Sequence, residues 1–150
     1  MTPLGLARLQ LDEGDALLVY DDKSGRPVGQ LPSGGWPTIG YGRNLATNGI
    51  TADEAVYLLN NSLLRIENQL NATFPWLTGR FNTVPTDVIT MVHYNTGNVG
   101  NFVLMLAAAK KSDWKTMAFE LMDSSAARQL PSRYQRMHDA LIFENWHGST

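Results

Sequence analysis

The chain has 150 residues, of which 43% are hydrophobic and 17% charged, and its net charge at pH 7 is −2. This length and balance predict one compact globular domain and exclude a disordered or fibrous chain. The lack of cysteine excludes disulfides and thiolate chemistry, and the lack of a basic run makes nucleic acid an unexpected partner.

The first predicted element is a short helix that runs into Asp12-Glu13-Gly14. A glycine after a helix commonly adopts the left-handed conformation that ends it, so we expect Glu13 at the helix end. Four leucines give this segment its helical character: Leu4, Leu6, Leu9 and Leu11.

Residues 16–41 alternate between apolar runs and turns rich in glycine and proline, which predicts short strands. The candidate strands are residues 17–20 and 36–41. The segment between them starts with Asp22-Lys23-Ser24-Gly25 and ends with Pro32-Ser33-Gly34-Gly35. We expect no β structure elsewhere in the chain.

A long helix is predicted over residues 51–71, after a turn at Asn48-Gly49. Thr51 and Glu54 have the spacing of a capping box, and apolar residues follow at helical intervals. Later helices are expected from Pro85 to Gly97 and over residues 102–111, 114–122 and 133–144. The sum is a single α+β domain with a β-containing lobe at 13–58, a connecting helix at 51–71, and a helical lobe formed by 1–12 and 72–150.

Other features limit the cellular setting and the cofactors. No stretch approaches the roughly 18 apolar residues of a membrane span, and residues 1–10 lack the regions of a signal peptide. We therefore expect a soluble protein, made in the cytoplasm, without stable membrane association. His93 has no second ligand at metal-binding spacing, so we expect a hydrogen-bonded packing residue, no metal and no cofactor.

Glu13 and Asp22 are two of 14 acidic residues, and most such pairs are ordinary surface groups. This pair has a distinct setting, because one carboxylate ends a helix and the other enters a glycine-rich turn. Both are expected to face one cleft. Glycoside hydrolysis needs one carboxyl group that keeps its proton and a second that stays ionised, so the pair also fits such an enzyme.

Three segments occur in a characteristic order: Leu11-Asp12-Glu13-Gly14, Tyr20-Asp21-Asp22 and Trp36-Pro37-Thr38-Ile39-Gly40-Tyr41-Gly42. Together they resemble the signature of the phage lysozymes, or endolysins, of glycoside hydrolase family 24, which includes the lysozymes of the T-even phages. Similarity extends to Val92-His93-Tyr94-Asn95 and Pro131-Ser132-Arg133. The resemblance implies a monomeric, lysozyme-like fold with an active-site cleft between the two lobes.

The resemblance also implies hydrolysis of the β-1,4 bond between N-acetylmuramic acid and N-acetylglucosamine in peptidoglycan. Glu13 would be the general acid, Asp22 the base or electrostatic partner, and Thr38 would position the attacking water. Inversion is expected, which requires carboxyl groups about 6.5–9.5 Å apart. Such an endolysin leaves the host cytoplasm through a holin-type pore and lyses the cell from the periplasm and cell wall.

Further residues are candidates for substrate binding. Arg133 resembles the family arginine that approaches the catalytic glutamate, an ion pair that burial of Glu13 must outweigh. Asn95 is expected to bind an N-acetyl group or to cap the turn before Gly97. Tyr41 is the preferred aromatic residue for stacking on a sugar ring; the four tryptophans could also stack, but aromatic residues in small proteins are more often core anchors. The tryptophans are Trp36, Trp76, Trp114 and Trp146.

The chain departs from the family in having a longer segment between Asp22 and Thr38, which predicts a longer hairpin or loop, and in lacking a basic net charge. Two other functions stay open. A lytic transglycosylase needs a single glutamate and leaves anhydromuramic ends, so the presence of Asp22 disfavours it. A catalytically silent wall-binding module is disfavoured because Glu13, Asp22 and Thr38 occur together.

Overall fold

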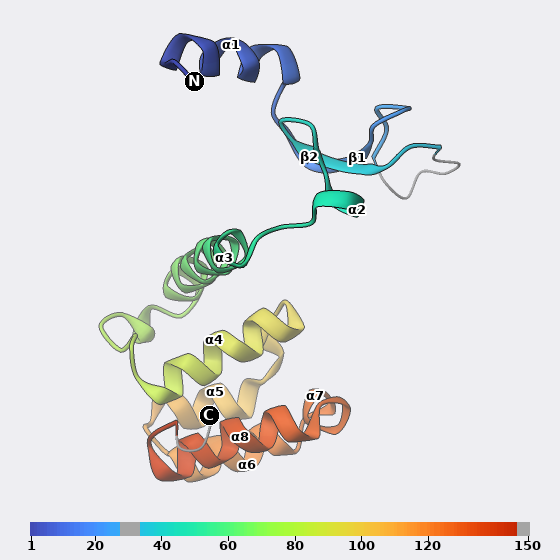
Figure 1. Cartoon of the computed structure of the whole chain (residues 1–150). Helices are drawn as coiled ribbons and strands as arrows, with labels where there is room; N and C mark the ends of the chain where they lie inside the picture. The colour runs from blue at the N-terminus through green and yellow to red at the C-terminus, as the bar shows by residue number, and fades with distance from the viewer. Residues whose placement is uncertain (28–33, 147–150) are drawn as a thin grey trace. The chain divides into compact units, whose positions relative to one another are not determined.

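The structure is a computed structural model that describes residues 1–27 and 34–146, and it confirms an α+β fold. The chain divides into two compact units, Met1–Tyr57 and Leu58–Thr150, and each is described by itself. The β structure belongs to the first unit, and the second is helical (Figure 1). The assignment of residues 1–12 to the helical lobe stays a prediction, as does the cleft. The predicted long loop falls largely on residues 28–33, outside the described ranges.

Helix α1 (Pro3–Glu13) opens the first unit. Thr2 caps it by accepting a hydrogen bond from the N–H of Gly5 at 3.1 Å. The helix ends at Glu13, as predicted, where Gly14 takes a φ of 69°. The ψ of Gly14 is 168°, so the predicted left-handed helical cap is wrong. Gly14 instead combines a positive φ with this ψ, a conformation outside the left-handed helical region, and strand β1 (Ala16–Asp21) begins two residues later.

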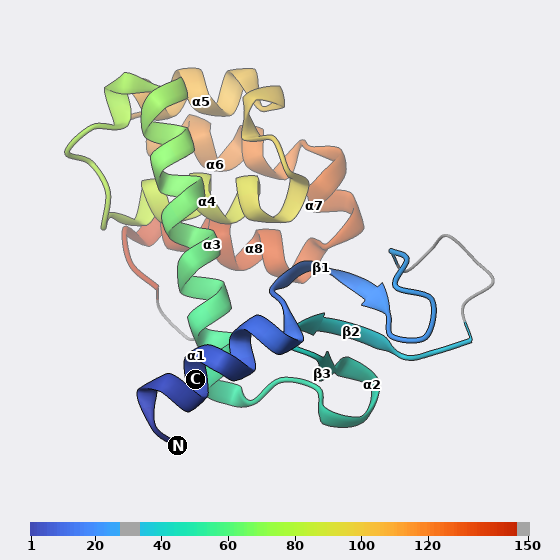
Figure 2. The ribbon, with the colours of Figure 1, turned by 90° about the horizontal axis from the view of Figure 1, so that it is seen from above.

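Within the described part of the chain, three strands form an antiparallel sheet in the order β1, β2, β3 (Figure 2). Strand β2 (Pro37–Gly40) pairs with β1, so that Tyr20 lies opposite Thr38. Strand β3 (Arg43–Asn44) pairs with β2. The expectation of no β structure after residue 41 is therefore wrong. A strand of two residues is too short to show an alternating pattern in the sequence.

The predicted capping box is present. The N–H of Thr51 donates to Glu54 Oε2 at 2.7 Å, and the N–H of Glu54 donates to Thr51 Oγ1 at 3.2 Å. Arg43 also donates to Glu54, which fastens β3 to the start of helix α3 (Ala52–Thr73). These contacts fix the position at which the 22-residue helix α3 begins after the sheet. The single-turn helix α2 (Leu45–Asn48) lies between them.

The second unit contains the rest of α3 and shorter helices. Pro85 and Pro131 lie in first turns and Gly97 ends a helix, as the sequence predicts. Gly97 takes the left-handed conformation there. The sequence missed the five-residue helix α7. After α3 the elements are η1 (Pro75–Leu77), α4 (Val84–Thr96), η2 (Val99–Asn101), α5 (Val103–Lys110), α6 (Trp114–Met122), α7 (Ser125–Gln129) and α8 (Pro131–Phe143). No helix in residues 1–27 or 34–146 is long and apolar enough to cross a membrane.

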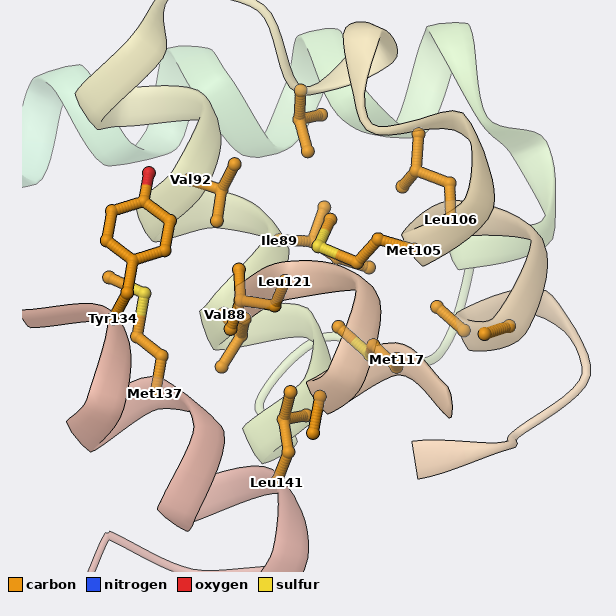
Figure 3. Packing of buried hydrophobic residues seen from close by; sticks show 14 of the residues in the cluster. Val88, Ile89, Val92, Met105, Leu106, Met117, Leu121, Tyr134, Met137 and Leu141 are labelled. Atoms are coloured by element: carbon orange, nitrogen blue, oxygen red, sulfur yellow. The ribbon is translucent and has the colours of Figure 1, made fainter. Parts of the chain in front are cut away.

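The core of the second unit is a cluster of buried side chains to which α4, α5, α6 and α8 contribute (Figure 3). Val88 and Val92 lie one helical turn apart on α4 and are fully buried. Tyr134, Met137 and Leu141 give α8 a matching apolar stripe. Tyr134 lies at the edge of the cluster, and its hydroxyl points away from Met137 and Leu141 (Figure 3).

Candidate active site

Glu13 is the last residue of α1, and its carboxylate lies beside the backbone of Gly42. A Cβ atom added to Gly42 would lie 2.9 Å from Glu13 Oε2. Gly42 has a φ of 76°, so two constraints, the backbone conformation and the close carboxylate, favour glycine there. The last turn of α1 and the turn between β2 and β3 thus meet at this carboxylate.

Asp22 follows β1 and is held by two hydrogen bonds to Trp36, the residue before β2. The N–H of Asp22 donates to the carbonyl of Trp36 at 3.1 Å. In return the N–H of Trp36 donates to Asp22 Oδ1 at 2.7 Å. Asp22 is exposed, so the reciprocal pair fixes a solvent-facing carboxylate in one orientation.

Thr38 is joined to Asp22 through the same carbonyl. Its hydroxyl donates to the carbonyl oxygen of Trp36 at 3.1 Å, which therefore accepts hydrogen bonds from both residues. Thr38 is 3% exposed. Because its proton is committed to Trp36, the Thr38 hydroxyl can only accept a hydrogen bond from a further group.

Asp21 is a residue of this site that the sequence analysis missed. It is buried, and its two oxygens accept the N–H groups of Ser24 and Gly35, each at 2.8 Å. Hydrogen bonding by Ser24 is the largest cause that holds the pKa of Asp21 below its usual value, while burial acts in the opposite direction. The signal was an aspartate three residues before Ser24, in a turn that continues into Gly25, because aspartate side chains in turns commonly accept nearby backbone N–H groups.

The structure therefore places Glu13, Asp22 and Thr38 in one unit. Asp22 and Thr38 are connected through the carbonyl of Trp36, and Glu13 lies beside Gly42, shortly after β2. One condition for the acid role is not met in this state. Glu13 is exposed, and no residue in the described ranges donates a hydrogen bond to its carboxylate. The burial expected from the sequence is thus absent within the first unit as it stands.

Tyr41 directly follows β2 and is 50% exposed. It lines a surface cavity of about 510 Å³ together with residues of α1 and the segment after it, which include Gln10 and Asp15. Trp36 is exposed as well, whereas Trp76 and Trp114 pack against the core of the second unit. Tyr41, Trp36 and Tyr57, which is 67% exposed, are thus aromatic side chains of the first unit that are free to meet a flat ligand.

Asn95 and Arg133 lie in the second unit and bond each other. Arg133 Nη1 donates to Asn95 Oδ1 at 2.8 Å, and Asn95 Nδ2 donates to the hydroxyl of Tyr134 at 3.2 Å. The side chain of Asn95 is thus directed across to α8 and does not cap the turn before Gly97. Arg133 also lines a largely apolar cavity of about 420 Å³ together with Met91 and other residues of α3, α4 and α8.

His93 is buried, as predicted for a packing residue, and the hydrogen bond expected for its ring is not formed at Nδ1 by any described residue. Its Nδ1 atom is inaccessible to solvent and has no partner within the described residues. In the same ranges no group of three or more His, Cys, Asp or Glu side chains could hold a metal ion.

No protein-family model matches this chain, and no curated protein sequence is significantly similar to it.

Proposed function

We propose that the chain is a muramidase of the phage lysozyme class, which hydrolyses the β-1,4 bond between N-acetylmuramic acid and N-acetylglucosamine. One observation carries the proposal. Asp22 and Thr38 both bond the carbonyl of Trp36, and Glu13 lies against Gly42 at the other end of the same β2 region. Two carboxylates from separate elements and a water-binding hydroxyl are the groups that an inverting glycosidase uses.

Each group has a distinct task. Glu13 donates its proton to the glycosidic oxygen as the bond breaks. Asp22 stays ionised, with Oδ1 engaged by Trp36, and Oδ2 takes a proton from the attacking water. Thr38 accepts a hydrogen bond from that water. A bound sugar ring covers Glu13 and excludes water from its carboxyl group, which favours the protonated form and supplies the burial that is absent without substrate.

The remaining assignments follow from the same proposal. Tyr41 stacks on a sugar ring, and Asn95 and Arg133 bind polar groups of the glycan strand. The protein acts as an endolysin, which a holin-type pore releases from the host cytoplasm, and cleavage of the peptidoglycan lyses the cell.

The experiment is digestion of purified peptidoglycan, followed by mass spectrometry of the released muropeptides. The parent is expected to leave reducing muramic acid ends. Glu13→Gln and Asp22→Asn should each reduce the rate by about a hundredfold or more. Asp53→Asn removes an exposed carboxylate of the same unit and should keep the parent rate.

Other outcomes would contradict the proposal. Anhydromuramic ends would indicate a lytic transglycosylase. Binding to the wall without release of muropeptides would indicate a silent binding module. Unchanged cleavage by Glu13→Gln would exclude Glu13 as the acid.

A further inference from the structure

We propose that Tyr134 is a positioning residue that fixes the amide of Asn95 and, through it, the guanidinium of Arg133. The inference rests on the proposed function, which assigns Asn95 and Arg133 to substrate binding. Tyr134 itself is fully buried and does not reach solvent. Its phenol ring packs in the core, and its hydroxyl is the one polar atom that the side chain carries to the core's edge (Figure 3).

The bonding partners determine which way the amide of Asn95 faces. A guanidinium group only donates hydrogen bonds, so the Asn95 atom 2.8 Å from Arg133 Nη1 must be the carbonyl oxygen Oδ1. The amide nitrogen then faces Tyr134 and donates to its hydroxyl at 3.2 Å. Without that hydroxyl the nitrogen loses its partner, and the amide is free to rotate away from Arg133.

The three residues also join two helices. Asn95 lies on α4, whereas Arg133 and Tyr134 are neighbours on α8. Arg133 is exposed and has a long, mobile side chain, whose ordering would cost conformational entropy on binding. The bond to a fixed Asn95 oxygen orders the guanidinium before a ligand arrives.

The ordered side chains of Asn95 and Arg133 present N–H hydrogen-bond donors. Among the described residues, only Asn95 accepts from the Arg133 guanidinium, so its other N–H groups are left to a ligand, as is the second N–H of the Asn95 amide. Such an arrangement suits an acceptor oxygen, such as the carbonyl of an N-acetyl group. Tyr134 therefore affects the binding of substrate and not the chemical step.

The test is steady-state cleavage of soluble peptidoglycan fragments by Tyr134→Phe. Phenylalanine keeps the packed ring and removes only the hydroxyl. KM is expected to rise about three- to tenfold, the loss of affinity that corresponds to the net contribution of one hydrogen bond. The value of kcat should change less than about twofold. Tyr94→Phe removes an exposed phenol hydroxyl one position from Asn95 and should change neither constant. An unchanged KM, or a loss confined to kcat, in Tyr134→Phe would overturn the inference.

A double-mutant cycle separates positioning from a general structural effect. If Tyr134 acts through Asn95, Tyr134→Phe should add nothing to the KM of Asn95→Ala. Additive effects of the two substitutions would show that Tyr134 acts by another route and would reject the inference.

The side-chain amide resonances of Asn95 in a ¹H–¹⁵N spectrum provide a readout that needs no activity. They should shift in Tyr134→Phe and stay in place in Tyr94→Phe, and unshifted resonances in Tyr134→Phe would refute the positioning role. An inactive parent with shifted resonances would refute the proposed function alone. An active parent with an unaffected Tyr134→Phe would refute this inference alone.

Discussion

Asp22 and Trp36 bond each other twice, through N–H to carbonyl at 3.1 Å and N–H to carboxylate at 2.7 Å. The pair closes the turn after β1 onto the start of β2 and holds the Asp22 carboxylate near the backbone that bears Thr38. Gly35, the residue before Trp36, lies directly against this turn. The close approach of Gly35 to Asp22 makes the geometry of the proposed base sensitive to a single methyl group.

We expect Gly35→Ala to disrupt this turn. A Cβ atom on Gly35 would overlap Asp22 Oδ1 and lie 2.6 Å from the backbone nitrogen of Lys23. That backbone nitrogen can move only if the turn after β1 moves with it. The free energy of unfolding should fall by about 1–3 kcal/mol, measured by urea denaturation. The rate of peptidoglycan cleavage should fall by about tenfold or more, because Asp22 is displaced.

Gly34→Ala is the matched control for that substitution. Its added Cβ would lie 3.4 Å from Cδ and Nζ of Lys23, atoms of a flexible side chain. The expected change in unfolding free energy is below about 0.5 kcal/mol, with normal cleavage. Equal effects of the two substitutions would contradict the close packing of Gly35 on Asp22.

A second pair of glycines separates backbone strain from the position of Glu13. Gly42 and Gly79 both have a φ of 76°, so alanine at either should cost about 1–2 kcal/mol of stability. At Gly42 the new Cβ meets Glu13 Oε2, an atom of the proposed acid, whereas at Gly79 it meets nothing within 4 Å. Glu13 is flexible and can yield, so stability should fall similarly in both variants.

Cleavage should distinguish the two. Gly42→Ala moves the proposed acid and should slow the reaction by about ten- to a hundredfold, whereas Gly79→Ala should keep the parent rate. The measurements are urea denaturation and muropeptide release. A Gly42→Ala variant with full activity would mean that the Glu13 carboxylate does not work from its place beside Gly42.

Acid should weaken the turn that Asp21 organises. Its folded-state pKa lies below its usual value, so its contribution to stability is present above the unfolded pKa of about 3.9 and is lost as pH falls through the folded pKa. Asp21→Asn should therefore be less stable than the parent near neutral pH and show a smaller loss of stability on acidification. Glu54, Asp113 and Asp139 have lowered pKa values too, so part of the acid sensitivity persists in the variant.

Urea denaturation at a series of pH values from about pH 7 to about pH 3 measures this effect. Asp53→Asn, which changes an exposed aspartate of the same unit, should keep the parent's acid dependence. If Asp21→Asn and the parent lose stability in parallel, the carboxylate of Asp21 is not the group that holds the turn.

The sequence predicted those elements whose ends are set by local chemistry. The capping box at Thr51 located the start of α3, and Gly97 located the end of α4. It failed for α2, β3 and α7, which have five residues or fewer and depend on the surrounding structure for their stability. An element of that length has no hydrophobic period to detect.

The candidate site shows the same division. Glu13, Asp22 and Thr38 were found because each lies in one of three short segments that occur in a characteristic order. Asp21 was missed because its role depends on the N–H of Gly35, which is 14 positions away. Tyr134 was missed because a buried tyrosine is normally a packing residue, and its polar partner lies 39 positions away in the sequence. Contacts of that separation appear only once the chain has folded.

His93 is buried, as the sequence predicts. The environment of its ring predicts that an apolar substitution raises the free energy of unfolding. The ring is buried and Nδ1 has no partner among the described residues, and a buried polar atom without a partner costs about 1–3 kcal/mol. His93→Leu removes that atom at similar volume and should raise the free energy of unfolding by about 1 kcal/mol, measured by urea denaturation. His138→Leu is the matched control, because the ring of His138 is paired with Asp139 at 2.9 Å, and the same substitution there should lower stability. A loss of stability in His93→Leu would show that Nδ1 has a partner, such as a buried water, that satisfies it in solution.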